Sequence, residues 1–402
     1  MAPTSPRSVA EHQAQVAALI GTMPVVELPL ADCLGLVLAE DLSSPVPLPL
    51  FDNSAMDGYA VRSVDIAGAD PDHPVELPVT ADIPAGSTDI VPLRPGAAHR
   101  IMTGAPIPPG ADSVVQVELT DGGMPTVRVN APVRPGTHIR RTGEDVIEGA
   151  TVLLAGAELG PAQLGLAAAV GTAAARVHRR PRVLVLSTGS ELVAAGNPLR
   201  AGQIYESNGV LLASAVRTVG GTARQLRLVP DDVTAFHAAL EPELDWADLV
   251  VTSGGVSAGA YEVVKDALTG QGVEFVRVAM QPGGPQGAGR YRGVPVVTLP
   301  GNPVSAAVSF EVFLRPALRA ALGHRAAVGP PAVAALTAEV TAPAGKRQYR
   351  RGRYEPETGV VSPIGGPGSH LLAALATANC LFVVPEEVVS LPAGAEVEIV
   401  PL

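Results

Sequence analysis

Residues 182–189 read RVLVLSTG, an apolar run that ends in two hydroxyl side chains and a glycine. Unbroken apolarity of this kind is typical of a strand that is covered on both faces of a sheet. Four similar runs follow, namely RQLRLVP, DLVVTSGG, VEFVRVA and VPVVTLPG. Helical patterns such as SNGVLLASAVRTVG and AYEVVKDALTGQG separate them. Apolar strands that alternate with helices predict a doubly wound, mostly parallel sheet for residues 181–323.

The preceding part of the chain, residues 1–176, mixes helical and strand patterns. VAEHQAQVAALIGTM and DCLGLVLAEDL read as helices, and the helical pattern returns at PAQLGLAAAVG. Between them, short runs such as VELPVTADI and PTVRVNAPV alternate with proline and glycine, which is typical of short strands joined by turns. This order predicts a small β lobe, about residues 46–142, inserted into an N-terminal linker domain.

Residues 330–402 begin within the linker GPPAV and read again as short strands, with one short helix at SHLLAALATAN. They predict a small, β-rich, barrel-like C-terminal domain. A chain of 402 residues is too long for one ordinary hydrophobic core, so several domains are expected. The predicted fold class is therefore multidomain α/β plus β, with a central doubly wound sheet.

Composition narrows the kinds of partner. A net charge of −11 disfavours nucleic acid and acidic membrane surfaces as partners. The chain has no uninterrupted apolar run of about 18 residues and no apolar export signal, so we expect a cytoplasmic protein without membrane partners. Cys33 and Cys380 lie far apart and read as reduced structural thiols. Lys265 and Lys346 are the only lysines, so arginine must supply most of the positive charge for an anionic ligand.

Three strands of the predicted sheet end in loops that combine glycine with hydroxyl or amide side chains. These loops are STGSEL (187–192), TSGGVSAG (252–259) and LPGNPVS (299–305). Ligands of open parallel sheets bind at the carboxyl ends of the strands, where helix N-termini offer free N–H groups to oxyanions. Tight packing explains any one loop, whereas three together favour an anion-binding edge. None matches the Walker A or GxGxxG pattern, which disfavours an ordinary NTPase or dinucleotide enzyme.

Acidic residues follow the same strands, at Glu191, Asp231, Asp232 and Glu262. Carboxylates beside phosphate-binding loops are suited to Mg²⁺, which prefers oxygen ligands and bridges to phosphates. The alternative interpretation is structural, with the aspartate pair capping a helix and Glu262 as a first-turn helix acid.

The β lobe carries three polar stretches, FDNSAMDGYA (51–60), RIMTGAP (100–106) and RRTGED (140–145). By themselves, Ser54 and Asp57 resemble a capping box, the Asp57–Gly58 step favours a turn, and RRTGED reads as a solvated charged turn. In the C-terminal domain, RQYRRGR (347–353) reads as an exposed basic strand.

Seven motifs occur in the order seen in one known family: FDNSAMDGYA, RIMTGAPIPPGAD, RRTGEDV, LSTGSEL, QIYESN, TSGGVSAG and LPGNPVSAAVSF. They resemble the MoeA family of molybdopterin molybdenumtransferases, to which the E domain of gephyrin is similar. The resemblance spans nearly the whole chain and includes the C-terminal GSH segment, residues 368–370.

This resemblance implies insertion of molybdate into adenylylated molybdopterin, with release of AMP and assistance by Mg²⁺. It implies that the middle block is similar to MogA-type molybdopterin adenylyltransferases, with which the protein would make transient contact. It also implies a homodimer whose active site combines the sheet edge of one subunit with the β lobe of its partner. A rival interpretation is the adenylyltransferase step itself, and a second is a dimeric, non-catalytic scaffold or cofactor-binding paralogue.

By the same resemblance, functional residues match positions of this chain one by one. The expected catalytic acids are Asp57, Asp145, Glu191 and Asp231. The expected metal ligands are Glu191, Asp231 and Glu262. The expected substrate-binding residues are Thr103, Ser187, Thr188, Gly189, Ser253, Gly254, Gly255, Ser257, Pro300, Gly301, Asn302, Pro303, Arg351 and Ser369.

The chain departs from the family pattern at one loop in particular. Many members carry KPGKP, whereas residues 281–285 read QPGGP, so both lysines are absent. Either Arg277, Arg290 or Arg292 supplies the missing positive charge, or the molybdate site is altered in a specialised paralogue. A smaller departure is Ser190, which replaces the aspartate of STGDEL.

Overall fold

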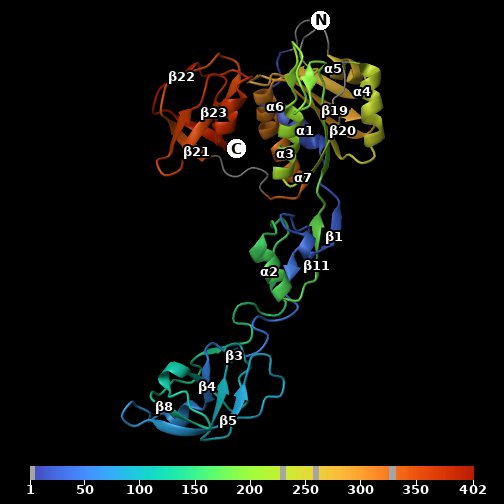
Figure 1. Ribbon diagram of the computed structural model, residues 1–402. Coiled ribbons are helices and arrows are strands. Elements are labelled where there is room, and N and C mark those ends of the chain that lie inside the picture. Colours follow the sequence, from blue (N-terminus) through green and yellow to red (C-terminus); the bar gives the residue numbers. More distant parts are fainter. Residues whose placement is uncertain (1–4, 227–231, 257–261, 326–331) are drawn as a thin grey trace.

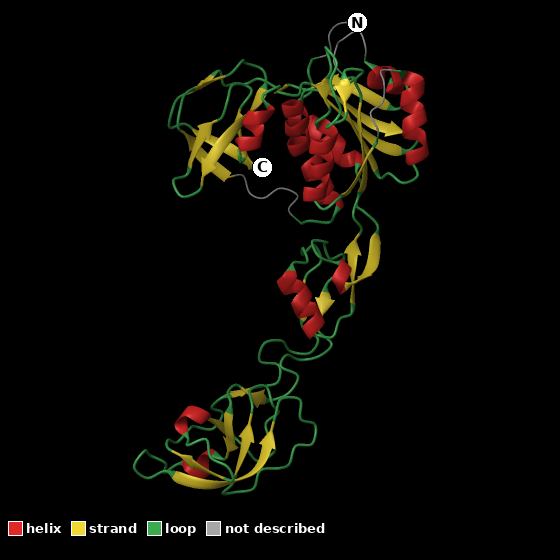
Figure 2. Ribbon diagram, viewed as in Figure 1, coloured by secondary structure: helices red, strands yellow, loops and turns green. Residues whose placement is uncertain are grey.

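The computed structural model describes residues 5–226, 232–256, 262–325 and 332–402. The molecule is elongated, with a central α/β unit and a C-terminal β unit side by side at one end (Figure 1). A narrow linker domain leads from the central unit to a β lobe at the opposite end (Figure 1). Helices gather around the central sheet, whereas the β lobe and the C-terminal unit are mainly strands (Figure 2). No helix in these described ranges is long and apolar enough to cross a membrane.

The central sheet has six strands in the order β15 (Thr222–Gln225), β12 (Arg182–Ser187), β16 (Leu249–Ser253), β20 (Val294–Leu299), β19 (Pro285–Tyr291) and β17 (Val273–Arg277). The first four strands are parallel, and β19 is antiparallel to both of its neighbours. The expected mostly parallel sheet is confirmed. Strand β19 escaped prediction because its sequence, PQGAGRY, is rich in glycine and lacks branched residues.

Alternate residues of β12 enter different cores, which makes the sheet doubly wound. Val183 and Val185 belong to the larger core, and Leu184 and Leu186 belong to the other. The helical segments of the larger core are α1 (Val9–Leu19), α3 (Asn208–Thr218), α6 (Pro303–Ser309), η5 (Phe310–Leu314) and α7 (Arg315–Ala321). Helices α4 (Val233–Leu240) and α5 (Val263–Leu268) cover the second face.

The linker domain is a small unit around Leu36, Leu38 and Leu159. Its elements are β1 (Val25–Pro29), η1 (Leu30–Asp32), β2 (Leu42–Ser43), β10 (Thr151–Leu153), α2 (Pro161–Ala169) and β11 (Ala174–His178). The helix expected at DCLGLVLAEDL is wrong. Gly35 sits there at a φ of +70°, outside helical backbone, and Leu36 and Leu38 reach the core from irregular chain.

The β lobe holds a five-stranded sheet in the order β7 (Ser113–Gln116), β4 (Gly58–Val61), β6 (Ala98–Ile101), β5 (Val75–Ile83) and β8 (Thr126–Val129). The short strands β3 (Asn53–Ser54) and β9 (Ile139–Arg140) pair beside it, and the turns η2 (Ser63–Ile66) and η3 (Val117–Leu119) complete the lobe. Tyr59, Val61 and Val115 are among the residues of its core. The expected β lobe therefore has its own hydrophobic core.

The C-terminal unit is a closed barrel. Its strands run in the order β23 (Arg347–Glu355), β24 (Val360–Pro363), β21 (Ala332–Leu336), β27 (Glu396–Pro401) and β25 (Cys380–Val384), and β25 pairs back onto β23. Strand β18 (Met280–Gln281), which lies in the sequence of the central unit, adds to β23. The barrel also carries β22 (Val340–Thr341), β26 (Ser390–Leu391) and α8 (Leu372–Thr377).

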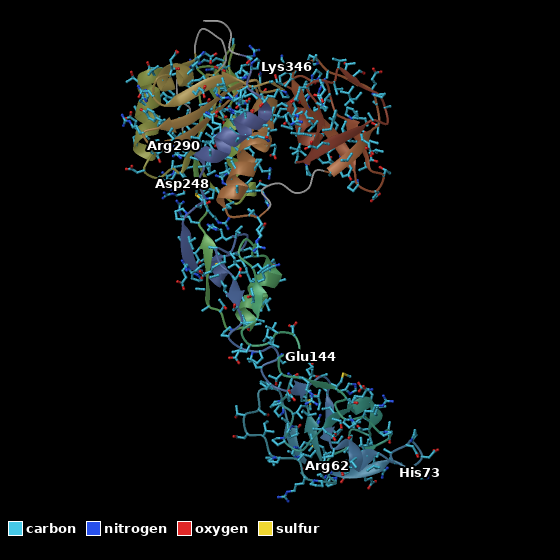
Figure 3. The ribbon with its side chains drawn as sticks, turned by 180° about the vertical axis from the view of Figure 1, so that it is seen from behind. Arg62, His73, Glu144, Asp248, Arg290 and Lys346 are labelled. Atoms are coloured by element: carbon cyan, nitrogen blue, oxygen red, sulfur yellow. The ribbon has the colours of Figure 1, made fainter. Side chains whose placement is uncertain are left out.

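Polar contacts fix the linker domain to the central unit. Arg180 donates to the carbonyl oxygen of Gly220 at 3.0 Å and to that of Leu34 in the linker domain at 2.8 Å. The neighbouring Arg179 forms two hydrogen bonds with Asp248, at 2.6 and 2.8 Å. Asp248 lies at the edge of the central unit that faces the linker domain (Figure 3). Arg180 therefore connects the linker domain to the central unit, and Arg179 fixes the adjoining chain to Asp248.

Candidate functional site

A cavity of about 510 Å³ lies at the carboxyl ends of β12, β16 and β20. The three glycine loops form its floor, and the start of α3 forms one side. Of the residues expected at the site, it brings together Thr188, Gly189, Glu191, Ser253, Gly254, Gly255, Glu262, Gly301, Asn302 and Pro303. Its volume is in the range of sites that enclose a small molecule. We call it the strand-end cavity.

Glycine is required in the floor because the loops touch one another there. Gly254 has a φ of +93°, and a Cβ atom on it would lie 2.8 Å from the carbonyl oxygen of Thr188. A Cβ atom on Gly301 would lie 3.3 Å from the Cα atom of Gly254. Any side chain at position 254 would therefore push the loops apart and fill the floor.

Two polar residues at the start of α3 tie the strand ends together. The carboxylate of Glu206 accepts hydrogen bonds from the Ser187 hydroxyl at 2.9 Å, the Gly209 amide at 2.5 Å and the Gln225 side chain at 3.2 Å. The Asn208 amide donates to the Ser253 hydroxyl and the Gly301 carbonyl oxygen, both at 2.7 Å. Together they connect the ends of β15, β12, β16 and β20.

Neither residue was among those selected from the sequence. Ser207 is the N-cap of α3 but makes no capping hydrogen bond with its side chain, and Asn208 bridges two loops. Glu206 is only 6% exposed. The sequence feature that could have identified both residues is the QIYESN motif, in which a carboxylate and an amide flank a serine between a strand and a helix.

The charges of the strand-end cavity are negative. Glu191, Glu206 and Glu262 line it, and its described lining contains no lysine or arginine. The expectation that arginine supplies the positive charge is therefore not met in this lining. Within the described ranges, no three His, Cys, Asp or Glu side chains are placed to hold a metal ion. The cavity thus combines neutral hydrogen-bonding groups with carboxylates, a mixture that favours an anion bound together with a cation.

Two of the expected residues, Asp231 and Ser257, lie outside the described residues. The neighbouring Asp232 is the N-cap of α4, where its side chain accepts a hydrogen bond from the Ala235 amide at 2.7 Å. For Asp232, the structural interpretation of the aspartate pair is therefore correct.

A second cavity of about 450 Å³ continues from the first toward the C-terminal barrel. The two cavities share Val256, Gly301, Asn302 and His370. Pro300 and Ser369 line the second cavity, and the Ser369 carbonyl oxygen accepts a hydrogen bond from the Val304 amide at 3.1 Å. The GSH segment of the barrel therefore docks on the first turn of α6.

Arg351 occupies a different place from the other expected residues. It lines a third cavity, of about 430 Å³, together with Arg350. The Arg351 side chain is 4% exposed and donates to the carbonyl oxygens of Gly366 and Gly368, so it holds the loop that leads to the GSH segment. Burial lowers the pKa of Arg351. The third cavity shares Gln281 and Pro367 with the second, which makes one continuous groove between the two units.

The β lobe, which carries the expected residues Asp57 and Thr103, lies at the opposite end of the chain from the central and C-terminal units (Figure 1). Asp57 is exposed and accepts hydrogen bonds from the Thr103 amide at 2.6 Å and the Thr103 hydroxyl at 2.7 Å. Both hydrogen bonds lower the pKa of Asp57, and the bond from the Thr103 amide has the larger effect. The expected turn at Gly58 and the capping box are wrong, because Gly58 begins strand β4, where a Cβ atom would collide with the Val115 carbonyl oxygen.

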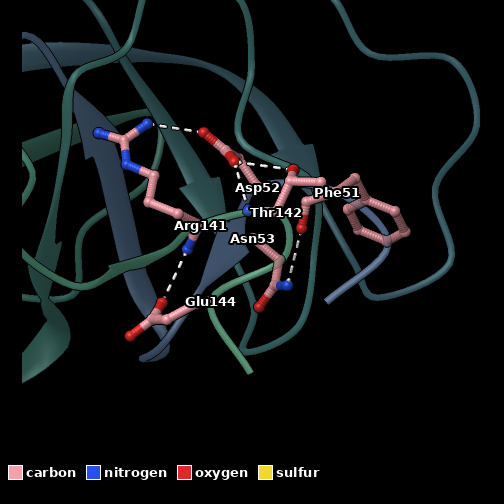
Figure 4. A network of polar contacts seen from close by, with 6 residues as sticks. All are labelled: Phe51, Asp52, Asn53, Arg141, Thr142 and Glu144. Carbon is pink, nitrogen blue, oxygen red and sulfur yellow. Dashed lines mark hydrogen bonds and ion pairs between the residues drawn. The ribbon is translucent and has the colours of Figure 1, made fainter. Parts of the chain in front are cut away.

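The RRTGED stretch is held by the carboxylate of Asp52, which lies near the start of the lobe in sequence. Asp52 accepts from the Thr142 amide at 2.8 Å, the Thr142 hydroxyl at 2.9 Å and the Arg141 guanidinium at 2.6 Å (Figure 4). Glu144 closes the turn by accepting from the Arg141 amide at 2.9 Å (Figure 4). The turn is therefore ordered as well as charged. Glu144 lies where the lobe meets the linker domain, and the adjacent Asp145 is exposed (Figure 3).

The fold and the cavities define a ligand-binding α/β protein, with a polar site at the strand ends and a groove that leads to a C-terminal barrel. Three family descriptions match successive parts of the chain: the MoeA N-terminal region (residues 7–171), a probable molybdopterin binding domain (184–320) and the MoeA C-terminal region (333–402). The chain belongs to the MoeA family of molybdopterin molybdenumtransferases, and it is an enzyme of molybdenum cofactor biosynthesis.

Full-length relatives agree with this assignment. Molybdopterin molybdenumtransferase 2 of Mycobacterium tuberculosis is 54% identical, over 98% of this chain and 99% of the relative. The molybdopterin molybdenumtransferase of Haemophilus influenzae is 38% identical over 91% of each chain. The crystal structure of the MoeA protein from Pyrococcus horikoshii superposes with a TM-score of 0.82 at 33% identity, over 99% of each chain.

Proposed function

We propose that the enzyme inserts molybdate into adenylylated molybdopterin and releases AMP, with the help of Mg²⁺. The observation that carries this proposal is the pair of joined cavities, one floored by glycine loops and the other reaching the barrel. A substrate that carries a pyrophosphate between two bulky ends needs such a site, with a floor for phosphates and room on both sides.

The floor of the strand-end cavity suits the phosphates. The hydroxyls of Thr188 and Ser253 and the close backbone of Gly254 offer neutral hydrogen-bonding groups at the strand ends. The buried Thr188 hydroxyl has no hydrogen-bond partner in the described structure, so a ligand oxygen would satisfy it. Release of AMP breaks the phosphoanhydride bond, and water supplies the new oxygen atom.

The residues present fit Mg²⁺, although the described part of the chain holds no complete set of protein ligands. Mg²⁺ typically takes one or two carboxylates and completes its shell with water and substrate phosphates. Glu191 and Glu262 line the cavity beside the floor and would hold the ion, with Asp231 as the proposed third acid. The ion would offset the negative charge of the phosphates as the anhydride bond breaks.

The proposed catalytic acids of the β lobe require a second subunit. Within one chain, the β lobe that carries Asp57 and Thr103 lies at the opposite end of the molecule from the central and C-terminal units (Figure 1). Asp145 follows Glu144, which lies where the lobe meets the linker domain (Figure 3). A homodimer that brings the lobe of one subunit to the cavities of the other would complete the site. The lowered pKa keeps Asp57 ionised at neutral pH, so it presents a negative charge that can accept a hydrogen bond or contact a cation.

The test is an assay of AMP release by the purified chain, given adenylylated molybdopterin, Mg²⁺ and increasing molybdate. We expect release that depends on molybdate and is lost when Asp231 is replaced by asparagine. Consumption of ATP with unmodified molybdopterin would indicate the adenylyltransferase step instead. Binding of molybdopterin without any turnover would indicate a scaffold or carrier.

The QPGGP loop bears on how tightly molybdate binds. Of the three arginines considered as replacements, Arg290 is committed to the carbonyl oxygens of Gly293 and Leu19, and Arg292 is paired with Glu241. Only Arg277 stands beside the loop, where its Cγ atom would lie 4.0 Å from a Cβ atom on Gly284. We therefore propose that Arg277 supplies the positive charge near this loop.

Restoring a lysine tests this compensation. A Cβ atom on Gly284 would meet no atom closer than 3.4 Å, so the Gly284→Lys variant should fold. We expect it to lower the molybdate concentration needed for half-maximal release by about fivefold, because one more cation faces the anion. Arg277→Gln should raise that concentration, and an unchanged value in both variants would contradict an electrostatic role for this loop.

A further inference from the structure

Two polar side chains are buried next to the larger core of the central unit, beside the QPGGP loop. Gln286 follows the loop as the second residue of β19, and Ser309 is the last residue of α6. Gln286 is 1% exposed and Ser309 is 0% exposed, while Val308 and Phe310 belong to the apolar core. Burying an amide and a hydroxyl beside apolar side chains is unfavourable unless hydrogen bonds offset it. We call Gln286 and Ser309 the buried polar pair.

The side chain of Gln286 connects the QPGGP loop to α6. Its Nε2 atom donates to the Gly283 carbonyl oxygen and to the Ser309 hydroxyl, both at 2.7 Å. Both protons of the amide are thereby used. Gly283 fits closely here, since a Cβ atom on it would lie 3.0 Å from the Ser309 Oγ atom and 3.4 Å from the Met280 Cε atom. The loop therefore lies against the end of α6 through one carbonyl group.

The loop and the start of α6 line the second cavity. They contribute Gln281, Pro282, Gly283, Pro285, Asn302 and Ser305 to it. Neither member of the buried polar pair is among its described lining residues. Because the pair connects these two parts of the lining from behind, the spacing between them depends on the pair.

Two further contacts hold the loop, and both are made by the backbone. The Val278 amide donates to the Gly284 carbonyl oxygen at 2.7 Å, which closes the base of the loop. Strand β18, at the start of the loop, pairs with β23 of the barrel. Backbone contacts survive a change of side chain, so a substitution at Gln286 would release the Gly283 carbonyl group without detaching the loop.

We propose that Gln286 and Ser309 are positioning residues for molybdate, because they hold Gly283 at a fixed distance from α6 in the lining of the second cavity. This inference rests on the proposed function, which brings molybdate to the QPGGP loop. The pair acts from behind the lining and takes no part in the bond changes. Its loss should therefore weaken molybdate binding and leave the maximal rate of AMP release nearly unchanged.

The first test compares the molybdate dependence of AMP release in three variants. Gln286→Met keeps an unbranched side chain of similar length but removes both hydrogen bonds, and we expect it to raise the half-maximal molybdate concentration about tenfold, with the maximal rate within about twofold. Ser309→Ala keeps the bond to Gly283 and should raise that concentration about threefold. The double variant should match Gln286→Met, because both changes act through one network. An unchanged half-maximal concentration in Gln286→Met would overturn the inference.

Val183→Ala is the matched control for a general loss of stability. Val183 is fully buried in the same core, at the start of β12, and does not line the second cavity. Its truncation leaves a void, so we expect a lower urea midpoint, followed by Trp246 fluorescence, with an unchanged molybdate dependence. If Val183→Ala shifted the molybdate dependence as much as Gln286→Met, the pair would serve the core alone and the inference would fail.

Hydrogen exchange tests the position of the loop without any substrate. In Gln286→Met, the amides of residues 278–286 should exchange at least about fivefold faster than in the unaltered chain. The amides of β4 in the lobe should exchange at the same rate in both proteins. Unchanged exchange in the loop would also overturn the inference.

These outcomes separate the inference from the proposed function. If the unaltered chain releases AMP in response to molybdate and Gln286→Met responds identically, only the positioning role fails. If the unaltered chain releases no AMP from the adenylylated substrate, the proposed function fails and takes the molybdate role of the pair with it.

Discussion

The two ends of the molecule hold their acidic residues in different ways. At the strand ends of the central sheet, carboxylates line a cavity that four strands help to build. In the β lobe, Asp57 is exposed and fixed by bonds within the lobe alone. At one end the carboxylates line a cavity, and at the other end Asp57 holds a fixed negative charge on the surface. The difference teaches that the lobe fixes its carboxylate by local contacts, whereas the cavity depends on residues from several strands. In the proposed dimer, the lobe would meet the cavity of its partner.

The largest expected effect comes from a substitution that fills the floor of the strand-end cavity. We expect Gly254→Ala to reduce molybdate-dependent AMP release by at least about 100-fold, because the new methyl group forces the loops apart in a left-handed backbone. Gly270→Ala is the matched control, since Gly270 also has a positive φ, of +76°, but open space around it. Equal loss in both variants would mean that backbone strain, rather than the shape of the floor, explains the result.

The next test removes the negative charge of Asp57 in the lobe and keeps its hydrogen bonds with Thr103. In Asp57→Asn, the side-chain oxygen can still accept from Thr103, so we expect normal folding and about a 100-fold slower release of AMP. Mixing this variant with Glu191→Gln should restore activity to roughly a quarter of the unaltered level, since mixed dimers would hold one intact shared site. Absence of any recovery, with dimers shown to exchange, would contradict a site shared between subunits.

Acid should affect the central unit through His12. This histidine is fully buried against Phe313, neither ring nitrogen has a hydrogen-bond partner in the described structure, and burial lowers its pKa from 6.5 to about 4. Because the unfolded chain takes up the proton first, stability present at neutral pH is lost as the pH falls from about 6.5 toward 4.

At pH 5 this linkage amounts to about 2 kcal/mol in the free energy of unfolding, roughly 30-fold in the folding equilibrium. We expect His12→Leu to remove it, whereas replacing the exposed His73 of the lobe should not. Fluorescence of Trp246, the single tryptophan and a residue packed in the central unit, reports the transition. Parallel pH profiles for the unaltered chain and His12→Leu would refute this assignment.

The smallest expected effect concerns the brace at the start of α3. Glu206→Gln keeps the size of the side chain but exchanges one acceptor oxygen for a donor, so the bonds from Ser187 and Gln225 cannot both survive. We expect the KM for the adenylylated substrate to rise about tenfold, with little change in kcat, because the floor loses its alignment. A fall in kcat at constant KM would instead place Glu206 in the chemical step.

Much of this architecture could be predicted because it depends on local pattern. The buried parallel strands, the glycine loops and the β lobe all follow from apolar runs and their punctuation. Two failures were local, since glycines hid strand β19 and interrupted the helix expected at DCLGLVLAEDL. The others depend on a distant neighbour. Gly58 needs its small size because Val115 approaches it, and Glu206 is defined by Ser187 and Gln225. Likewise, the expectation that RQYRRGR is an exposed strand is wrong, because Tyr349 and Arg351 within it are buried and Arg351 donates to two carbonyl oxygens.

Strand β18 has a consequence for how the chain can be divided. Its two residues belong to the central unit in sequence, yet they pair with β23 of the barrel. A gene fragment that begins at residue 332 would therefore encode a barrel with an exposed strand edge, and such edges invite aggregation. The C-terminal unit is thus a poor candidate for exchange between proteins as an independent module. Recombination would have to carry the central unit with it, which would also keep the groove between them intact.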